Sequence, residues 1–306
     1  MKINEFQFMD VGPEFSDFDA AAFAILPLPF EGGISYGAGT AQAPDAVIKA
    51  SAYIELYDDI LKAEPYKAGI VTLHPPKSHF HVDKLHEVIH EELEEIIQAK
   101  KFIVGIGGDH SITTPHFLAL KKKYGDFSVI QIDAHADLRA EYEGSPHSHA
   151  CVMARIREHT KQTLQLGIRS LSREEVDLVA AEKIDLVTMY AIRKGADWKA
   201  LLDKLPDPVF ITIDVDAFDW SVIASTGTPE PGGFLWHEAL DLFDAIFAVR
   251  NVIGFDVVEL SHAEHDRNSP VAAAKLIYHL IGLKIKYHLA KTGSDWPIAP
   301  AGPLFD

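Results

Sequence analysis

The sequence predicts an α/β protein: a three-layer α/β/α sandwich around a mainly parallel sheet of about eight strands. Two observations carry this prediction. Short runs rich in β-branched residues alternate with longer segments of helical periodicity along the whole chain. These short runs are apolar without polar alternation, which is typical of strands that helices cover on both faces.

The elements follow from these patterns in chain order. Polar residues, glycine or proline bound most of the short runs, and helical spacing of apolar residues marks the longer segments. The expected strands are residues 22–26, 68–71, 102–106, 127–132, 164–167, 186–189, 209–213 and 251–258. The expected helices are residues 81–99, 114–124, 172–181, 237–249 and 269–286.

Three helix starts carry capping signals. Ser172 followed by Glu175 is the pattern of a capping box. Asp197 is expected to cap a shorter helix that runs from Trp198 towards residue 206. Ser111 is expected to cap the helix that begins near residue 113.

Composition bounds the function. The chain has 306 residues, of which 47% are hydrophobic, so it can bury a large core. Its 28 basic and 45 acidic residues give a net charge of −17. This charge argues against nucleic acid or an anionic membrane as a partner and favours small cationic ligands.

No repeat, low-complexity tract or shift of composition divides the sequence, so we expect a single domain over residues 1–306. The single cysteine, Cys151, excludes an intrachain disulfide and a thiolate zinc cluster and fits a reducing compartment. We expect Cys151 itself to be a small packing residue. The first residues lack a secretory signal pattern, and no window approaches the roughly 20 apolar residues of a membrane span. A cytoplasmic location follows as an expectation.

The run Asp133-Ala134-His135-Ala136-Asp137 directly follows an apolar strand. Residues two apart in extended backbone project on the same side, so these three polar side chains can converge on one point. Nitrogen and carboxylate donors without thiolate suit hard or borderline divalent ions such as manganese. Taken alone, the run is equally typical of a solvated acidic loop.

Three other strands also end in polar groups. His110 follows Gly107-Gly108, and Asp214 and Asp216 repeat the alternate spacing behind another strand. Glu259 follows the last strand. In a parallel sheet the carboxyl ends of the strands meet at one edge, where ligands bind. Four buried aspartates there would raise one another's pKa unless cations offset their charge, so the cluster predicts a two-metal site.

These motifs resemble those of the ureohydrolases, the arginase and agmatinase family. The matching segments are Gly107-Gly108-Asp109-His110-Ser111, the Asp133 to Asp137 run, Asp214-Val215-Asp216, residues 227–233 and residues 35–40. The resemblance implies two Mn²⁺ ions per subunit. One would be held by His110, Asp133, Asp137 and Asp214, and the other by Asp133, His135, Asp214 and Asp216.

The resemblance also implies a histidine that shuttles protons from the loop after Asp137. His149 and His147 are the candidates, and His149 matches the family position better. Glu259 matches the family glutamate that pairs with the substrate guanidinium, a planar group that donates two parallel hydrogen bonds to a carboxylate. Thr228 and Glu230 are expected to shape the floor of the site.

The reaction implied is hydrolysis of a guanidinium group, in which Asp137 steadies the tetrahedral intermediate and His149 protonates the departing amine. The loop 139–149 resembles agmatinases, so agmatine, giving putrescine and urea, is the first expectation. N1-aminopropylagmatine, giving spermidine and urea, is a close alternative because the stretch 220–225 departs from the family pattern and is expected to border the pocket.

Other expectations remain open. Guanidinobutyrate, arginine and formiminoglutamate are further possible substrates, and a metal-binding protein without catalytic activity is the alternative from a different class. Ser261-His262 follows Glu259 where the family often has a proline. We expect His262 and His265 to be exposed loop histidines, and the alternative is that they line the entrance of the site. The family resemblance implies a homo-oligomer, either a trimer or a hexamer.

Overall fold

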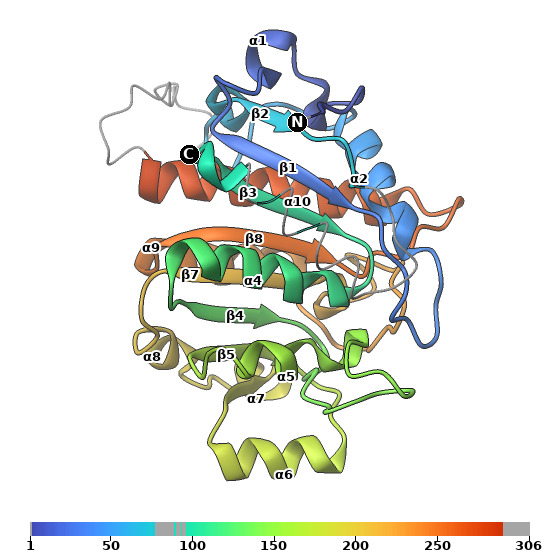
Figure 1. Cartoon of the computed structure of the whole chain (residues 1–306), viewed down its shortest axis with the longest axis vertical. Coiled ribbons are helices and arrows are strands. Elements are labelled where there is room, and N and C mark those ends of the chain that lie inside the picture. Colours follow the sequence, from blue (N-terminus) through green and yellow to red (C-terminus); the bar gives the residue numbers. More distant parts are fainter. Residues whose placement is uncertain (1, 77–88, 90–92, 94–95, 290–306) are drawn as a thin grey trace.

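The chain folds around an eight-stranded sheet in which every neighbouring pair of strands is parallel. The computed structural model describes residues 2–76, 89, 93 and 96–289. The strands are β1 Phe23–Leu28, β2 Ile70–Thr72, β3 Phe102–Gly107, β4 Ser128–Ile132, β5 Thr163–Ile168, β6 Asp185–Thr188, β7 Val209–Asp214 and β8 Val252–Val258. They lie in the order β2-β1-β3-β8-β7-β4-β5-β6 (Figure 1). The predicted parallel sheet of eight strands is confirmed.

Alternate residues of the strands feed two separate hydrophobic cores. In β1, Phe23 and Ile25 face one core, whereas Ala24 and Leu26 face the other. All six residues of β1 are buried, and so are all those of β3, β4, β5, β7 and β8. This is why the sequence shows continuous apolar runs rather than polar alternation.

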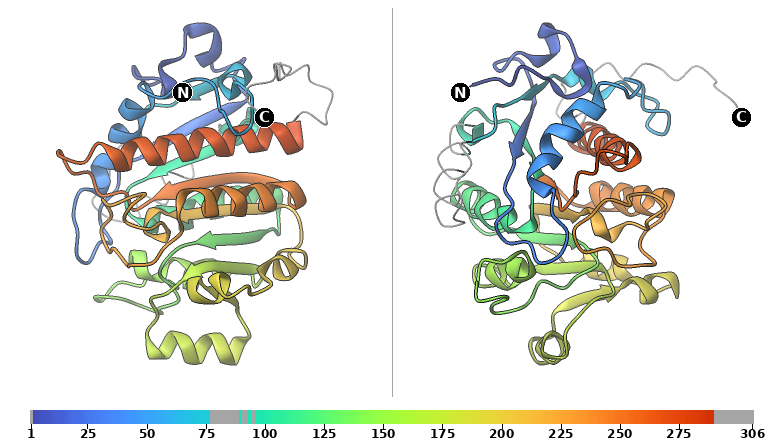
Figure 2. Two further views of the ribbon diagram at one scale, coloured as in Figure 1. Left: turned by 180° about the vertical axis from the view of Figure 1, so that it is seen from behind. Right: turned by 90° about the vertical axis from the view of Figure 1, so that its right-hand side faces the viewer.

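Helices cover both faces of the sheet, which confirms the three-layer sandwich (Figures 1 and 2). Residues of α2, α9 and α10 fill the core on one face, and residues of α4 and α5 fill the core on the other. The described helices are α1 Pro13–Ser16, α2 Ala43–Ser51, α4 Thr113–Tyr124, α5 Val152–Arg157, α6 Arg173–Glu182, α7 Met189–Arg193, α8 Trp198–Leu202, α9 Trp236–Val249 and α10 Asn268–Lys284.

The helix caps confirm two predictions and correct a third. The Ser172 side chain accepts a hydrogen bond from Glu175 N, and the Glu175 carboxylate accepts one from Ser172 N, which is the capping box expected for α6. Asp197 caps α8 through Ala200 N, although α8 ends at Leu202. The prediction for Ser111 was wrong, because Asp109 accepts hydrogen bonds from both its N–H and its hydroxyl.

Several short helices are absent from the sequence prediction. The helices α5 and α7 have six and five residues, too few to show helical periodicity. The helix α2 carries a proline in its first turn, a position where proline favours a helix start, so the sequence reading missed an available signal. The predicted helix over residues 81–99 falls mostly outside the described residues. Among the described residues, no helix combines the length and apolarity that a membrane crossing needs.

The strand order positions the site. The strands β3, β8, β7 and β4 are neighbours in the middle of the sheet. They are the four strands whose carboxyl ends carry the polar groups identified in the sequence. Residues up to 149 positions apart in the chain therefore meet at one edge of the sheet.

The ends of β1 and β3 meet at Gly108. Gly108 N donates to Leu28 O at 2.9 Å, and Asp109 N donates to Phe30 O at 2.9 Å. A Cβ atom on Gly108 would lie 1.8 Å from Phe30 O, far inside van der Waals contact with a backbone atom that cannot move alone. Glycine is needed here because the two chain segments approach so closely.

We expect Gly108→Ala to lower the free energy of unfolding by about 3 kcal/mol or more, because the added methyl group overlaps backbone. The matched control is Gly195→Ala. Gly195 has a φ of 84° but nothing within 4 Å of a built Cβ, so it should cost only about 1 kcal/mol of backbone strain. Urea denaturation measures both, and equal losses in the two variants would contradict the argument.

Candidate metal centre

The carboxyl ends of β3, β4 and β7 bring the predicted ligand side chains together in two overlapping groups. In the first group, ligand atoms of His110, Asp133 and Asp137 all lie within 4.8 Å of one another. His110 Nδ1 is 3.3 Å from Asp133 Oδ2 and 3.1 Å from Asp137 Oδ2. Asp214 Oδ2 approaches the same nitrogen at 3.3 Å. Three carboxylates and one imidazole thus surround one point.

The second group consists of Asp133, His135 and Asp216, again within 4.8 Å of one another. His135 Nδ1 is 2.9 Å from Asp216 Oδ2 and 3.7 Å from Asp133 Oδ1. Asp133 therefore belongs to both groups and turns a different oxygen to each. This is the geometry that a bridging carboxylate requires.

Buried polar residues on the same strands hold the ligands from behind. His110 Nε2 lies 2.9 Å from Thr212 Oγ1, which leaves Nδ1 to face the carboxylates. Gln131 Nε2 donates to Asp133 Oδ2 at 2.6 Å and contacts Asp137 Oδ2 at 3.3 Å. The sequence reading missed both residues. Period-two spacing could have found them, because each stands two positions before an aspartate ligand on its strand.

Arg169, just after β5, braces the second group. Its guanidinium donates to Asp216 O at 2.5 Å, to Glu230 O at 2.8 Å and to Pro231 O at 3.0 Å. These contacts join the segment after β7 to the loop that contains Glu230. The sequence reading missed Arg169 as well, and no local pattern marks it.

The electrostatics of the cluster call for cations. Burial, followed by the charges of Asp137 and Asp216, raises the pKa of Asp133 to about 8. Burial and the neighbouring aspartates also raise the pKa of Asp214 well above its usual range. Burial alone would lower the pKa of His135, but the Asp216 carboxylate outweighs it and raises that pKa to about 11. Protons and metal ions therefore compete for these side chains.

One atom tests directly whether a metal ion fits. His110 Nδ1 is buried, and no hydrogen-bond partner for it exists among the described residues. It nevertheless faces three carboxylate oxygens at 3.1–3.3 Å. A buried ring nitrogen that faces three carboxylate oxygens fits a shared divalent cation, and the donor set of nitrogen and oxygen suits such ions.

Two of the eight non-glycine residues with positive φ among the described residues lie at this centre. Asp137 and Glu259 have φ angles of 54° and 66°, in the left-handed region that non-glycine residues seldom adopt. Each such residue costs on the order of 1–3 kcal/mol, and such strain clusters at functional sites.

His149 lies beside the metal-ligand groups, and it is only 8% exposed. Its Nδ1 is 3.2 Å from Glu259 Oε1, and its Nε2 is 3.1 Å from Ser35 Oγ. Burial lowers the pKa of His149, but the Glu259 carboxylate outweighs this and raises it. Burial in turn raises the pKa of Glu259, whose Oε1 also accepts a hydrogen bond from His110 N at 2.7 Å.

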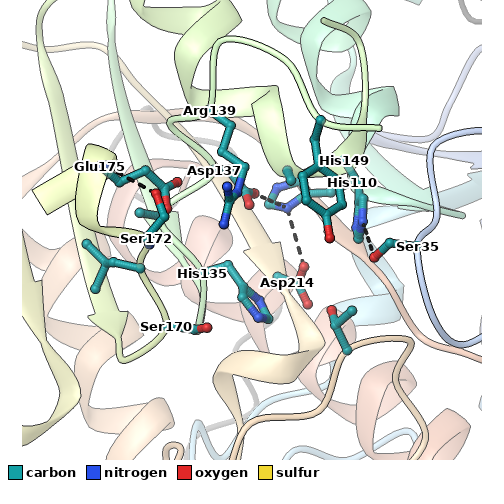
Figure 3. Close-up of a pocket in the computed structure, with 15 residues that line it drawn as sticks. Ser35, His110, His135, Asp137, Arg139, His149, Ser170, Ser172, Glu175 and Asp214 are labelled. Carbon is teal, nitrogen blue, oxygen red and sulfur yellow. Dashed lines mark hydrogen bonds and ion pairs between the residues drawn. The ribbon is translucent and has the colours of Figure 1, made fainter. Parts of the chain in front are cut away.

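A cavity of about 200 Å³ opens onto these side chains (Figure 3). The predicted residues that line it are His110, His135, Asp137, His149, Asp214 and Thr228. Ser35, Arg139, Tyr142 and Glu175 also line it and were not predicted as site residues, although Ser35 lies in the matching segment 35–40 and Glu175 in the predicted capping box. The two carboxylate oxygens of Glu175 accept hydrogen bonds from Leu138 N and Ser172 N, so its contacts are those of a capping residue.

Other predicted residues do not line this cavity. They are Asp133, Asp216, His147, Glu230 and Glu259, of which Glu259 is only 1% exposed. Thr228 Oγ1 reaches Asp216 Oδ2 at 3.5 Å. Cys151 is fully buried, and burial followed by the Asp137 charge raises the pKa of its thiol to about 11, which fits a packing role.

The loop 220–225 does not border this cavity, contrary to expectation. No residue of the loop lines it. Instead the loop is tied to the start of α10, where Ser269 Oγ accepts hydrogen bonds from Ala224 N and Ser225 N. His262 lines a separate surface groove between α2 and α10. Neither departure from the family pattern touches the cavity wall.

The fold and the paired ligand groups together define a class, the α/β sandwiches that can hold two metal ions at the carboxyl edge of a parallel sheet. Within that class, the sequence model described as the Arginase family matches residues 21–282. The chain belongs to the Arginase family. The resemblance to ureohydrolases, and with it the prediction of a hydrolase, is confirmed.

Named relatives cover most of the chain. It is 37% identical over 271 residues to an N(1)-aminopropylagmatine ureohydrolase of Synechocystis sp., covering 86% of this chain and 89% of the relative. It is 34% identical over 288 residues to an agmatinase of Pyrococcus horikoshii, covering 88% and 94%. The structure of an agmatine ureohydrolase of Thermoplasma volcanium superposes with a TM-score of 0.84 at 25% identity, covering 94% and 97%.

We expect Thr212→Val to weaken divalent-metal affinity about 10- to 100-fold, because His110 loses the partner that fixes its ring. Thr212→Ser is the matched control, since it keeps the hydroxyl group. Titration of the metal-stripped protein with Mn²⁺ measures both. Equal affinities for wild type and Thr212→Val would show that this contact does not support a metal ligand.

Proposed function

We propose that this chain hydrolyses the guanidinium group of a small cationic amine. N1-aminopropylagmatine and agmatine are the two substrates to test first. The observation that supports this proposal most directly is that two ligand groups share Asp133. Beside them lies the buried contact of His149 with Glu259. The sequence favoured agmatine. Three relatives that are 35–37% identical and named N(1)-aminopropylagmatine ureohydrolases support the longer substrate.

We propose two Mn²⁺ ions as cofactors. His110, Asp133, Asp137 and Asp214 would hold one, and Asp133, His135, Asp214 and Asp216 the other. The all-nitrogen-and-oxygen donor set and the buried excess of carboxylates support this choice. When bound, such a pair supplies Lewis acidity and a water whose pKa is lowered towards neutrality.

The remaining steps belong to side chains of this chain. Asp137, strained and partly facing the cavity, would steady the tetrahedral intermediate by accepting hydrogen bonds from it. His149, whose pKa is raised, would carry the proton for the departing amine. Glu259 would orient His149 through Oε1 and turn Oε2 towards the guanidinium. Its near-complete burial would strengthen such a charge-assisted contact.

Other substrate contacts are proposed with their structural support. Thr228 lines the cavity and would contact the substrate near Asp216. Glu230 would act only through its loop, which Arg169 holds by the backbone. His147 would need to turn towards the cavity, so we propose His149 as the proton carrier.

The wider setting is proposed from the sequence and the family. A single sheet with a core on each face supports one domain over residues 1–306. We propose a cytoplasmic homo-oligomer, a trimer or a hexamer, which meets a small guanidino substrate.

We expect manganese-loaded protein to release urea from N1-aminopropylagmatine or agmatine, with kcat/KM on the order of 10⁴ M⁻¹s⁻¹ or more. Arginine and guanidinobutyrate should be poorer substrates, and formiminoglutamate is tested by formamide release. The ratio of kcat/KM for the two amines identifies the preferred chain length. If no compound of the panel yields urea or formamide, the protein binds metal without catalysing this reaction.

We expect His149→Ala to lower kcat about 10²- to 10⁴-fold, because a positioned proton donor is lost. The variant should retain two bound metal ions, since His149 is not a proposed ligand. His147→Ala is the matched control from the same loop and should keep kcat near the wild-type value. A large loss in His147→Ala with none in His149→Ala would reverse the assignment.

A further inference from the structure

The His149 ring is engaged at both of its nitrogen atoms. Nδ1 faces Glu259, which is 1% exposed, and Nε2 faces the hydroxyl of Ser35 at 3.1 Å. Ser35 is exposed and lines the cavity, as Figure 3 shows. Of the two partners of this buried imidazole, only Ser35 therefore reaches the space where substrate and solvent enter.

The loop that carries Ser35 is fixed at both ends. On one side, Gly32 N and Gly33 N donate to Asp109 Oδ2 at 2.8 and 2.7 Å. On the other, Glu31 Oε2 accepts hydrogen bonds from Gly39 N at 2.6 Å, from the Thr40 hydroxyl at 3.1 Å and from Ala41 N at 3.2 Å. A carboxylate thus closes the loop 31–41 into a compact unit.

This loop also docks on the backbone next to His149. Gly33 O accepts a hydrogen bond from the Ser148 hydroxyl at 3.3 Å and contacts His149 N at 3.4 Å. A Cβ atom on Gly33 would lie 3.0 Å from His149 N. The distance between Ser35 and the imidazole is therefore set by contacts on both segments and does not depend on one side chain alone.

We propose that the Ser35 hydroxyl relays the proton between His149 and the departing amine. This inference rests on the proposed function and extends it. His149 also lines the cavity, but both of its ring nitrogens are engaged, so direct proton transfer to the amine would break a contact, whereas the exposed Ser35 hydroxyl keeps its contact with Nε2. A hydroxyl group can accept one proton while it donates another.

The proton balance is simple. As the C–N bond breaks, its electron pair stays on the amine nitrogen, which takes the proton of Ser35 Oγ. Ser35 Oγ takes the Nε2 proton of the imidazolium in the same step, and His149 becomes neutral. The attacking water leaves its oxygen in urea and gives up both of its protons: one restores the imidazolium over the cycle, and the other converts the released amine into an ammonium ion. No oxidant or further reactant is needed.

We expect Ser35→Ala to lower kcat on the order of 10- to 100-fold with little change in KM, less than the loss in His149→Ala because a water molecule can partly replace the hydroxyl. Ser35→Thr keeps a hydroxyl and should recover most of the activity. Tyr36→Phe is the matched control from the same loop, since Tyr36 is 85% exposed. It should behave like wild type.

Two readouts separate a relay from a merely structural role. The double variant Ser35→Ala/His149→Ala should be no slower than His149→Ala, because both residues serve one proton path. In mixtures of H₂O and D₂O, kcat of the wild type should depend on deuterium fraction with the curvature of two moving protons, and a strictly linear dependence in the wild type would contradict the relay.

The outcomes are distinguishable. If the wild type releases no urea, the proposed function fails. If the wild type is active and His149→Ala is impaired, but Ser35→Ala matches the wild type, only the relay is overturned. Multiplying losses in the double variant would likewise overturn it, since they would place Ser35 and His149 on independent paths.

Discussion

The repulsion among buried carboxylates is the constraint on which the rest of the site depends. Asp133, Asp214 and Asp216 are almost fully buried within one cluster, and burial penalises each charge. Folding can tolerate this only if cations or protons offset the charge. Asp133 resolves much of the problem by geometry, because its two oxygens face different histidines. Two cations bound at this site would therefore also offset the repulsion among the buried carboxylates.

The sheet converts that constraint into precise placement. The four central strands are covered on both faces, so their ends have little freedom, and rigid elements hold sites more accurately than loops do. Thr212 and Gln131 are buried polar residues within these strands. Their side chains orient the proposed ligands His110 and Asp133. The strained φ angles of Asp137 and Glu259 persist because these strand ends over-determine them.

Local patterns made the fold and the convergence of the polar side chains predictable, because strand runs and alternate aspartates both follow the period of two, whereas the ligand set itself came from the family resemblance. The same period could have indicated Thr212 and Gln131. Contacts between residues that are far apart in the sequence produce no such local pattern. Ser35 meets His149 over 114 positions, and Arg169 reaches Asp216 over 47. The position of the loop 220–225 was wrongly predicted for the same reason. A departure from a family pattern does not reveal which element the loop packs against.

Glu259 links the two halves of the chemistry. One of its oxygens accepts a hydrogen bond from His110 N and also contacts His149 Nδ1, so a proposed ligand of the first group and the proposed proton carrier share a single atom. A shift of His110 would therefore be felt at His149 through that carboxylate, even though the two imidazoles have no direct contact. The identity of a bound cation should then affect His149, the proposed acid, as well as the proposed nucleophilic water. The reason is that Glu259 contacts both the backbone of His110 and the ring of His149.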